Sequence, residues 1–282
     1  MSKFMLSYIE RPSFVHKLSG AAKLVVFLLW SVLAMVGYDT RIMLIMAVLG
    51  ISIFVVSKTK VREISFILKL LFIFMVLNLI TIYLFAPEQG VAIYGTRHVI
   101  REGIGRYSIT AEQLFYEFNV ALKYFIILPL AVILIVTVQP SEFAASLNRI
   151  GIPYSIAYAV SLTLRYIPDV QRDFENISQS QQARGIELSK KLSTGKSVSW
   201  VKRLKGFAAI LLPLIFSSID RIDVISHAME LRGFGKNKKR TWYAAKPFSK
   251  ADILVMAGAV LLFALGCWFT FRDGDRFYNP WG

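Results

Sequence analysis

The chain has 282 residues, of which 55% are hydrophobic, and it carries 33 Lys and Arg against 18 Asp and Glu, a net charge of +15. This composition excludes a disordered chain and is too hydrophobic for most soluble domains. The single cysteine, Cys267, excludes a secreted module held by disulfides. The composition therefore predicts a membrane protein with a basic polar part, or a membrane-bound nucleic-acid binder.

Five uncharged apolar runs occur along the chain: Leu24–Tyr38, Ile42–Ser57, Leu70–Ala86, Tyr124–Gln139 and Ile253–Phe271. A membrane span needs about 20 apolar residues, with roughly 17 as a lower limit, so the shorter runs require helices that extend beyond them. We expect an all-α integral membrane protein with about five transmembrane helices. Four lie in residues 1–139, interrupted by an external loop at about 87–111, and the last lies in residues 251–282.

The 87–111 loop is expected to contain a short strand or hairpin, and it leads into the fourth span. Thr110 and Gln113 at its end are spaced as in a capping box that begins a helix.

The distribution of Lys and Arg predicts the orientation in the membrane. Residues 140–250 hold 18 of the 33 basic residues but only 8 of the 18 acidic ones. With the N-terminus inside, this segment and the basic residues at 58–62 are cytoplasmic, whereas the three arginines of the 87–111 loop count against this orientation. The sequence favours a cytoplasmic N-terminus and a cytoplasmic domain at 140–250.

Within residues 140–250 the pattern indicates a pair of long amphipathic helices inserted before the last span. The first helix is expected from about Pro153 to Arg184, and Glu187–Ser199, rich in Lys, Ser and Thr, predicts a mobile loop. The second helix repeats apolar residues at helical spacing. These form a stripe expected to face the membrane bundle or a membrane-embedded partner: Trp200, Leu204, Leu211, Ile215, Ile222 and Met229.

The two long helices end in the same way. With an offset of 48 residues, Ile177-Ser178 falls on Ile225-Ser226, and Arg184-Gly185 falls on Arg232-Gly233. Gly can end a helix in the left-handed conformation, and Arg complements the negative end of the helix dipole. Alternatively, each Arg projects from a rigid helix end into an acidic groove on a partner and binds a carboxylate through two hydrogen bonds. The two roles are compatible, and two equivalent ends imply two equivalent partners.

Two stretches then carry a resemblance to a known family. Gln182-Ala183-Arg184-Gly185 and Met229-Glu230-Leu231-Arg232-Gly233-Phe234-Gly235 resemble the pair of Ala-Arg-Gly-type motifs in the T component (EcfT family) of energy-coupling factor transporters. The runs 146–153 and 162–168 resemble the segment before the first motif, and the resemblance covers about residues 105–240. One departure is Leu231, where the family more often has Ala.

The resemblance implies a non-catalytic scaffold in a prokaryotic cell membrane. Two ABC-type ATPases would bind it, one through Ala183, Arg184 and Gly185 and the other through Leu231, Arg232 and Gly233. A membrane-embedded S component would capture a vitamin or micronutrient and pack against the scaffold. ATP hydrolysis by the partners would then reorient the S component.

Other patterns favour neither a cofactor nor a metal site. Gly195-Lys196-Ser197 lacks the upstream Gly and the strand of a phosphate-binding loop, and the three histidines have no ligand spacing. The basic stretch Lys236–Arg240 precedes a span, which favours lipid headgroups over nucleic acid. Two alternatives stay open. One is a self-contained channel or carrier, disfavoured because the apolar runs contain no charge. The other is a membrane-bound enzyme, disfavoured because no catalytic side chains cluster.

Overall fold

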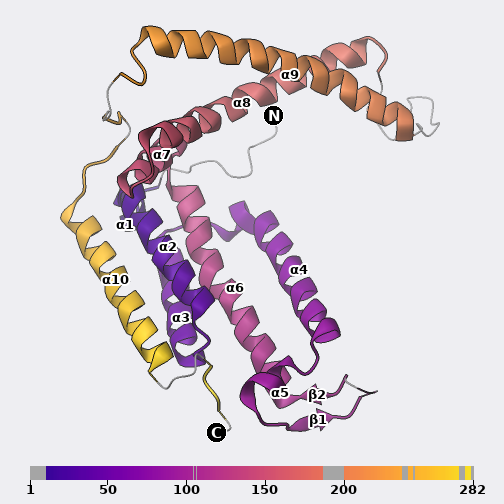
Figure 1. Ribbon diagram of the computed structural model, residues 1–282, viewed down its shortest axis with the longest axis vertical. Helices are drawn as coiled ribbons and strands as arrows, with labels where there is room; N and C mark the ends of the chain where they lie inside the picture. The colour runs from indigo at the N-terminus through magenta and orange to yellow at the C-terminus, as the bar shows by residue number, and fades with distance from the viewer. Residues whose placement is uncertain are drawn as a thin grey trace. The chain divides into compact units, whose positions relative to one another are not determined.

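The computed structural model describes residues 11–103, 105, 107–186, 200–236, 241–243, 245–272 and 277–280. These residues are almost entirely helical (Figure 1). They divide into two compact units, one formed by Met1–Ile150 with Ala245–Gly282 and the other by Gly151–Ala244. The second unit is therefore an insertion between two parts of the first.

The first unit is a helical bundle with one small sheet. Its helices are α1 (Phe14–Lys17), α2 (Gly20–Val36), α3 (Thr40–Val56), α4 (Val61–Phe85), α5 (Gln89–Tyr94), α6 (Ala111–Thr137), α7 (Pro140–Arg149) and α10 (Lys250–Phe271). Strands β1 (Val99–Arg101) and β2 (Ile109–Thr110) pair antiparallel, which confirms the predicted hairpin in the 87–111 loop. The second unit contains α8 (Tyr154–Ala183) and α9 (Trp200–Leu231).

Helix α6 lies at the centre of the first unit. It packs against α2, α3, α4 and α5, and α10 packs against α2. The main core joins α2, α3 and α6, where the Trp30 indole N–H donates to the Ile126 carbonyl at 3.2 Å. Helices α2 and α10 approach closely at Gly266, where the lack of a side chain makes room for Leu33. A Cβ added at Gly266 would lie 2.6 Å from a methyl carbon of Leu33. Helices α2, α3 and α6 thus bury apolar side chains against one another, whereas α4 and α10 leave most of theirs exposed.

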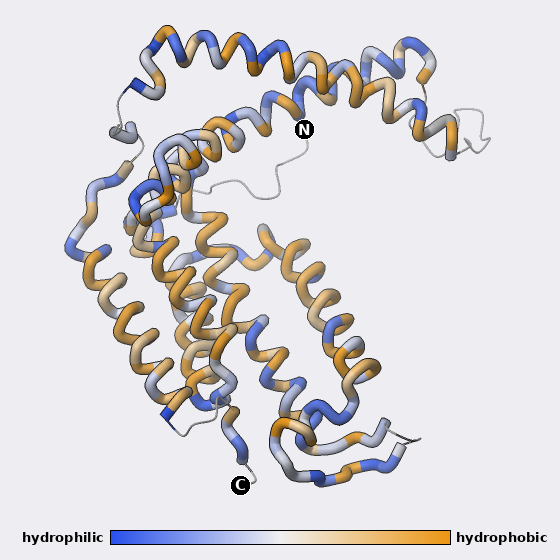
Figure 2. Tube along the Cα trace, viewed as in Figure 1, coloured by the Kyte–Doolittle hydropathy of each residue, from blue (hydrophilic) through white to orange (hydrophobic). Residues whose placement is uncertain are grey.

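Each of the five apolar runs forms most of a helix, and Figure 2 shows these helices as hydrophobic along most of their length. Among the described residues, three helical segments are long and apolar enough to cross a bilayer: Ile64–Phe85, Ala111–Thr137 and Lys250–Phe271. Helices α2 and α3 are apolar but have 17 residues each. At 1.5 Å per residue they are about 25 Å long, against a hydrocarbon core of about 30 Å. The chain is an all-α membrane protein, and the number of crossings stays a prediction.

Helix α6 begins thirteen residues before its apolar run, at the predicted cap. The Thr110 hydroxyl accepts from the Gln113 N–H at 3.3 Å, as the sequence predicted. The Gln113 side chain does not return to Thr110, however, but accepts from the Gly90 N–H at 2.9 Å. A Cβ at Gly90 would lie 2.4 Å from the Glu112 carbonyl oxygen. The second half of the predicted capping box is therefore replaced by a tight contact between α5 and α6.

Two buried carboxylates from distant parts of the chain bind the N-terminus of α2. Asp252 of α10 accepts from the backbone N–H of Ser19 at 2.8 Å and from that of Ser249 at 2.8 Å. Glu142 of α7 accepts from the Gly20 N–H at 2.7 Å. The first N–H groups of a helix have no partner within it and carry partial positive charge, so acids are stabilised there. The start of α2 thus holds α7 and α10 in place.

The same region contains the points where the chain leaves and re-enters the first unit. Lys246 Nζ lies 3.2 Å from Glu142 Oε2. The Arg149 guanidinium donates to the Lys246 carbonyl and lies 4.5 Å from the centroid of the Phe248 ring. We call Glu142, Arg149 and Lys246 the junction. Although the second unit separates them in sequence, residues 149 and 246 are neighbours in the first unit.

Candidate partner-binding site on the paired long helices

Helices α8 and α9 pack against each other and make up most of the second unit (Figure 1). Arg221 of α9 forms an ion pair with Asp173 of α8, and its guanidinium lies 5.9 Å from the centroid of the Tyr166 ring. Asp173 and Arg221 are 48 residues apart, the offset that also relates the two helix ends. When two helices are related by a two-fold axis, a residue of one helix contacts its own equivalent on the other only where the axis passes between them. The Asp173–Arg221 ion pair therefore marks the centre of a pseudo-two-fold pair of helices.

The two helices end with the same hydrogen-bond pattern. At the end of α8, the Gly185 N–H donates to the Gln182 carbonyl at 2.9 Å and the Ile186 N–H donates to the Gln181 carbonyl at 3.0 Å. At the end of α9, the corresponding bonds run from Gly233 to Glu230 at 2.8 Å and from Phe234 to Met229 at 2.9 Å. Both are Schellman motifs. The predicted capping role of Gly185 and Gly233 is thus confirmed in the backbone geometry.

Gly at the third motif position is favoured by conformation, since φ is +86° at Gly185 and +68° at Gly233. The residues before each Gly point outward. Ala183 and Arg184 are exposed, as are Arg232 and, at 90% exposure, Leu231. A leucine this exposed at a helix end, beside a cation, gives a small apolar and basic contact surface. We call residues 183–185 and 231–233 the two tips.

The tips lie at opposite ends of α8. Phe234, directly after the second tip, packs against Tyr158 with ring centroids 4.8 Å apart, near the start of α8. The Trp242 ring also packs there, 5.2 Å from that of Tyr154. From Tyr158 to the first tip, α8 rises 1.5 Å per residue over 25 residues, which separates the tips by roughly 40 Å. Each Arg lies eleven residues beyond the Asp173–Arg221 ion pair, so the tips are also equally far from the centre.

The predicted stripe on α9 is solvent-exposed in this chain. Met229 is half-buried. The other five side chains are 46–72% exposed: Trp200, Leu204, Leu211, Ile215 and Ile222. Ile222 also lines a groove of about 420 Å³ between α8 and α9, together with Tyr166, Val170 and Ile225. An exposed apolar surface of this kind is typical of a protein or membrane contact.

The histidines make separate polar contacts. His16 Nδ1 lies 2.6 Å from the Ser13 hydroxyl, and His98 Nδ1 lies 2.6 Å from Glu112 Oε1. Within the described residues, no group of three or more His, Cys, Asp or Glu is arranged to hold a metal ion. The predicted mobile loop Glu187–Ser199, with Gly195-Lys196-Ser197, and residues 237–240 of the basic stretch lie outside the described residues.

Sequence reasoning missed two features of the second unit. The Asp173–Arg221 ion pair was missed although the same 48-residue offset, applied to charged residues, relates its two members. The aromatic cluster of Tyr154, Tyr158, Phe234 and Trp242 joins residues far apart in sequence, and no local pattern indicates it.

Replacing either tip glycine with Ala is expected to lower the free energy of unfolding by about 1 kcal/mol, because an L-residue is strained in the left-handed region. There is no steric contribution, since no atom lies within 4 Å of a Cβ added at Gly185 or Gly233. Thermal unfolding in detergent measures the effect. Gly258→Ala in α10 is the control, because its Cβ also meets nothing while Ala is favoured in a helix interior. Equal responses at all three positions would contradict the left-handed caps.

The helices, the inserted unit and its twin tips define a multi-pass α-helical membrane protein with a long helix pair of its own. The sequence pattern of the family described as cobalt transport protein (CbiQ) matches residues 11–243, so the chain belongs to that family. Among its curated relatives, the energy-coupling factor transporter transmembrane protein EcfT of Brevibacillus brevis is 25% identical, covering 93% of this chain and 97% of its own length. The proteins of the same name from Bacillus subtilis and Streptococcus thermophilus are 25% and 24% identical, covering 92% and 94% of this chain and 94% and 99% of their own lengths.

These relatives confirm the predicted resemblance to the transmembrane components of energy-coupling factor transporters. They are named as transporter components and not as enzymes, and the apolar helices agree with a place in the membrane.

Proposed function

We propose that the chain is the scaffold of an energy-coupling factor importer. Two cytoplasmic ABC-type ATPases bind its two tips, and a membrane-embedded S component that carries a vitamin or micronutrient binds its apolar surfaces. ATP binding and hydrolysis move the ATPases, and the paired helices pass this motion to the S component. The N-terminus and the second unit face the cytoplasm, and catalysis belongs to the partners.

The observation that carries this proposal is the equivalence of the tips. Both end in a Schellman motif, both expose an Arg beside a small or apolar residue, and both lie eleven residues from the pseudo-two-fold centre. One capped helix end is ordinary, whereas a symmetric pair with exposed cations fits two copies of one kind of partner.

The separation of the tips supports two partner subunits over one. A standard interface buries about 800 Å² on each partner, which is a patch roughly 30 Å across. Tips roughly 40 Å apart along α8 therefore do not fit within one such patch. Each tip would have its own acidic groove, and a bidentate contact from the planar guanidinium would fix orientation as well as position.

The exposed stripe and the groove between α8 and α9 supply the remaining surface. Leu204, Leu211 and Ile215 are between 46% and 55% exposed, and such side chains favour a buried position. An S component rich in apolar side chains fits this surface. A movement of the two ATPases would be transmitted along α8 and α9 to this surface, because the groove is lined in part by Arg221 of the central ion pair between the two helices.

Site-specific crosslinking tests the proposal. The chain is co-expressed with the two ATPases and the S component from the same genome, with a photo-crosslinking residue in place of Ala183 or Leu231. We expect each position to link to an ATPase subunit. Arg172 is the control position, since its side chain is 78% exposed on α8 but lies outside both tips. Crosslinks only within this chain, or equal linking from position 172, would overturn the assignment.

A further inference from the structure

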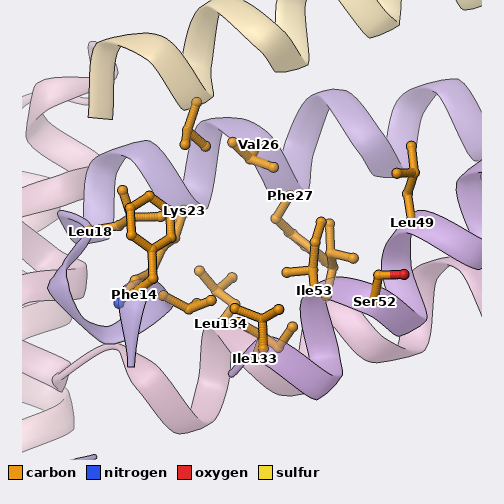
Figure 3. A pocket seen from close by; sticks show the side chains of 14 residues that line it. Phe14, Leu18, Lys23, Val26, Phe27, Leu49, Ser52, Ile53, Ile133 and Leu134 are labelled. Atoms are coloured by element: carbon orange, nitrogen blue, oxygen red, sulfur yellow. The ribbon is translucent and has the colours of Figure 1, made fainter. Parts of the chain in front are cut away.

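The first unit contains an apolar cavity of about 280 Å³ that the proposed function does not use. It is lined by residues from α2, α3 and α6, by the start of α10 and by the short helix α1, which contributes Phe14 and Val15. In Figure 3 the Val26, Phe27, Ile53 and Leu134 side chains gather around it. Its volume is near the lower end of ligand pockets, about 300 Å³.

The cavity offers little to a polar ligand. Ser52 and Lys23 are its polar lining side chains, and both already donate to backbone carbonyls. The Ser52 hydroxyl donates to the Val48 carbonyl at 2.8 Å, and Lys23 Nζ donates to the Thr137 carbonyl at 3.0 Å. All the remaining lining residues are apolar. A hydrocarbon chain is the occupant that this wall suits, because it needs no hydrogen bond.

The two segments that border the cavity near Leu18 and Val56 are basic, and we call this end of the cavity its mouth. Lys17 of α1 precedes the lining residue Leu18, and the exposed Lys58 follows the lining residue Val56 by two positions. Arg11 donates to the Lys58 carbonyl, so these two segments meet. From residue 11 to residue 62 the sequence contains one acid, Asp39, which caps the opposite end of α3. The acids Glu142 and Asp252, which act on the lining residue Lys23, are bound to backbone N–H groups at the start of α2, so the two bordering segments keep a net positive charge.

Lys58 also has an unusual backbone conformation. Its φ is +57°, and among the described residues it is the one non-glycine residue with a positive φ. It follows the end of α3, where Gly would fit without strain. Lys58 therefore holds an exposed cation at the end of α3 in a backbone conformation that is strained for a residue with a side chain.

We propose that this cavity binds one anionic phospholipid, with an acyl chain among the residues of α1, α2, α3 and α6 and the phosphate between Lys17 and Lys58. Only an anionic amphiphile matches both parts of the site. A neutral lipid fits the cavity but gains little at the mouth, and a soluble anion fits the mouth but not the cavity. Lys and Arg near the surface of a membrane attract anionic headgroups in this way.

Native mass spectrometry of the purified full-length chain tests this, with phosphatidylglycerol and phosphatidylcholine of identical acyl chains as probes. Phosphatidylglycerol should bind at least about five-fold more tightly, and Lys17→Gln and Lys58→Gly should each lower its affinity roughly five-fold without changing that of phosphatidylcholine. Lys58→Gly removes the charge while keeping the backbone conformation. Val26→Phe, which fills the cavity, should weaken the binding of both lipids.

Two controls separate this site from general attraction to lipid. Arg101→Gln removes an exposed cation from β1, which contributes nothing to the cavity, and Ile73→Phe enlarges an exposed side chain of α4. Neither should change the binding of either lipid. Equal binding of the two lipids by the unmodified chain would overturn the proposal, as would equal losses in Arg101→Gln and Lys58→Gly. If Val26→Phe unfolds on thermal assay, the two charge variants decide the result.

Discussion

Charge reversal at both tips, Arg184→Glu with Arg232→Glu, is expected to abolish ATP-driven uptake by the reconstituted complex. Loss of one close Arg–carboxylate contact at an interface costs about 2–5 kcal/mol, partly because the partner acid is left unpaired. Each ATPase would therefore bind its tip at least about 30-fold more weakly, and both attachments are lost together. The measurements are co-purification of the ATPases with the chain and substrate uptake into proteoliposomes.

A double variant with the same change of net charge provides the control. Arg172 on α8 and Lys205 on α9 are both exposed, and Arg172→Glu with Lys205→Glu should leave assembly and uptake intact. If the tip variant assembled and transported like the control, the tips would not be the sites of ATPase binding. Helicity measured by circular dichroism should stay the same in both variants, because the caps depend on the backbone and on Gly.

The second large effect is expected for Asp252→Ala, which should destabilise the first unit by about 2–5 kcal/mol. Asp252 is 2% exposed and accepts from the N–H groups of Ser19 and Ser249. Its removal leaves the buried Ser19 N–H without a partner, at about 1–3 kcal/mol. It also removes the cap at the exposed Ser249, at about 1–2 kcal/mol. Thermal unfolding in detergent measures the loss, and Asp252→Asn, which keeps one acceptor oxygen, should lose less.

Asp39→Ala is the matched control for Asp252→Ala. Asp39 caps α3 through a single bond from the Arg41 N–H at 2.9 Å and is partly exposed. Its loss should cost only about 1 kcal/mol, as for an ordinary N-cap. Similar losses in the two variants would mean that Asp252 is no more than a local cap of α10.

The first long helix of the second unit was predicted from sequence to within one residue at each end. Helix α8 was expected from Pro153 to Arg184 and runs from Tyr154 to Ala183. Proline before a helix and glycine after it are local signals, and they act at the same positions in the folded chain. The Arg-Gly ends of both helices followed from the same signals, whereas their binding role stays a prediction.

The starts of the membrane helices were predicted less well. The apolar run suggested a start near Leu70 for α4, which begins at Val61. The run at Tyr124 alone would also have misplaced the start of α6, but the cap predicted at Thr110 gave its start at Ala111 correctly. A charged residue ends an apolar run without ending a helix. Glu112, for example, lies upstream of the apolar run, in the first turn of α6. Its carboxylate is fully buried and accepts from the His98 N–H, which satisfies it there.

The buried acids show where sequence reasoning ends. The spacing of Ser249 and Asp252 is that of a capping box, and the structure contains both of its hydrogen bonds. That pattern predicts the start of α10, yet it does not indicate that Asp252 also binds Ser19. Neither does any local pattern join Glu142 to Gly20. Contacts over more than 100 residues depend on the packing of the whole bundle.

The junction fixes the two ends of the inserted segment next to each other. Because the Arg149 guanidinium donates to the Lys246 carbonyl, and Lys246 pairs with Glu142, residues on either side of the insertion are held together within the first unit. Glu142 also accepts from the Gly20 N–H in the first turn of α2. A single carboxylate therefore stabilises both the return of the chain from the insertion and the start of α2.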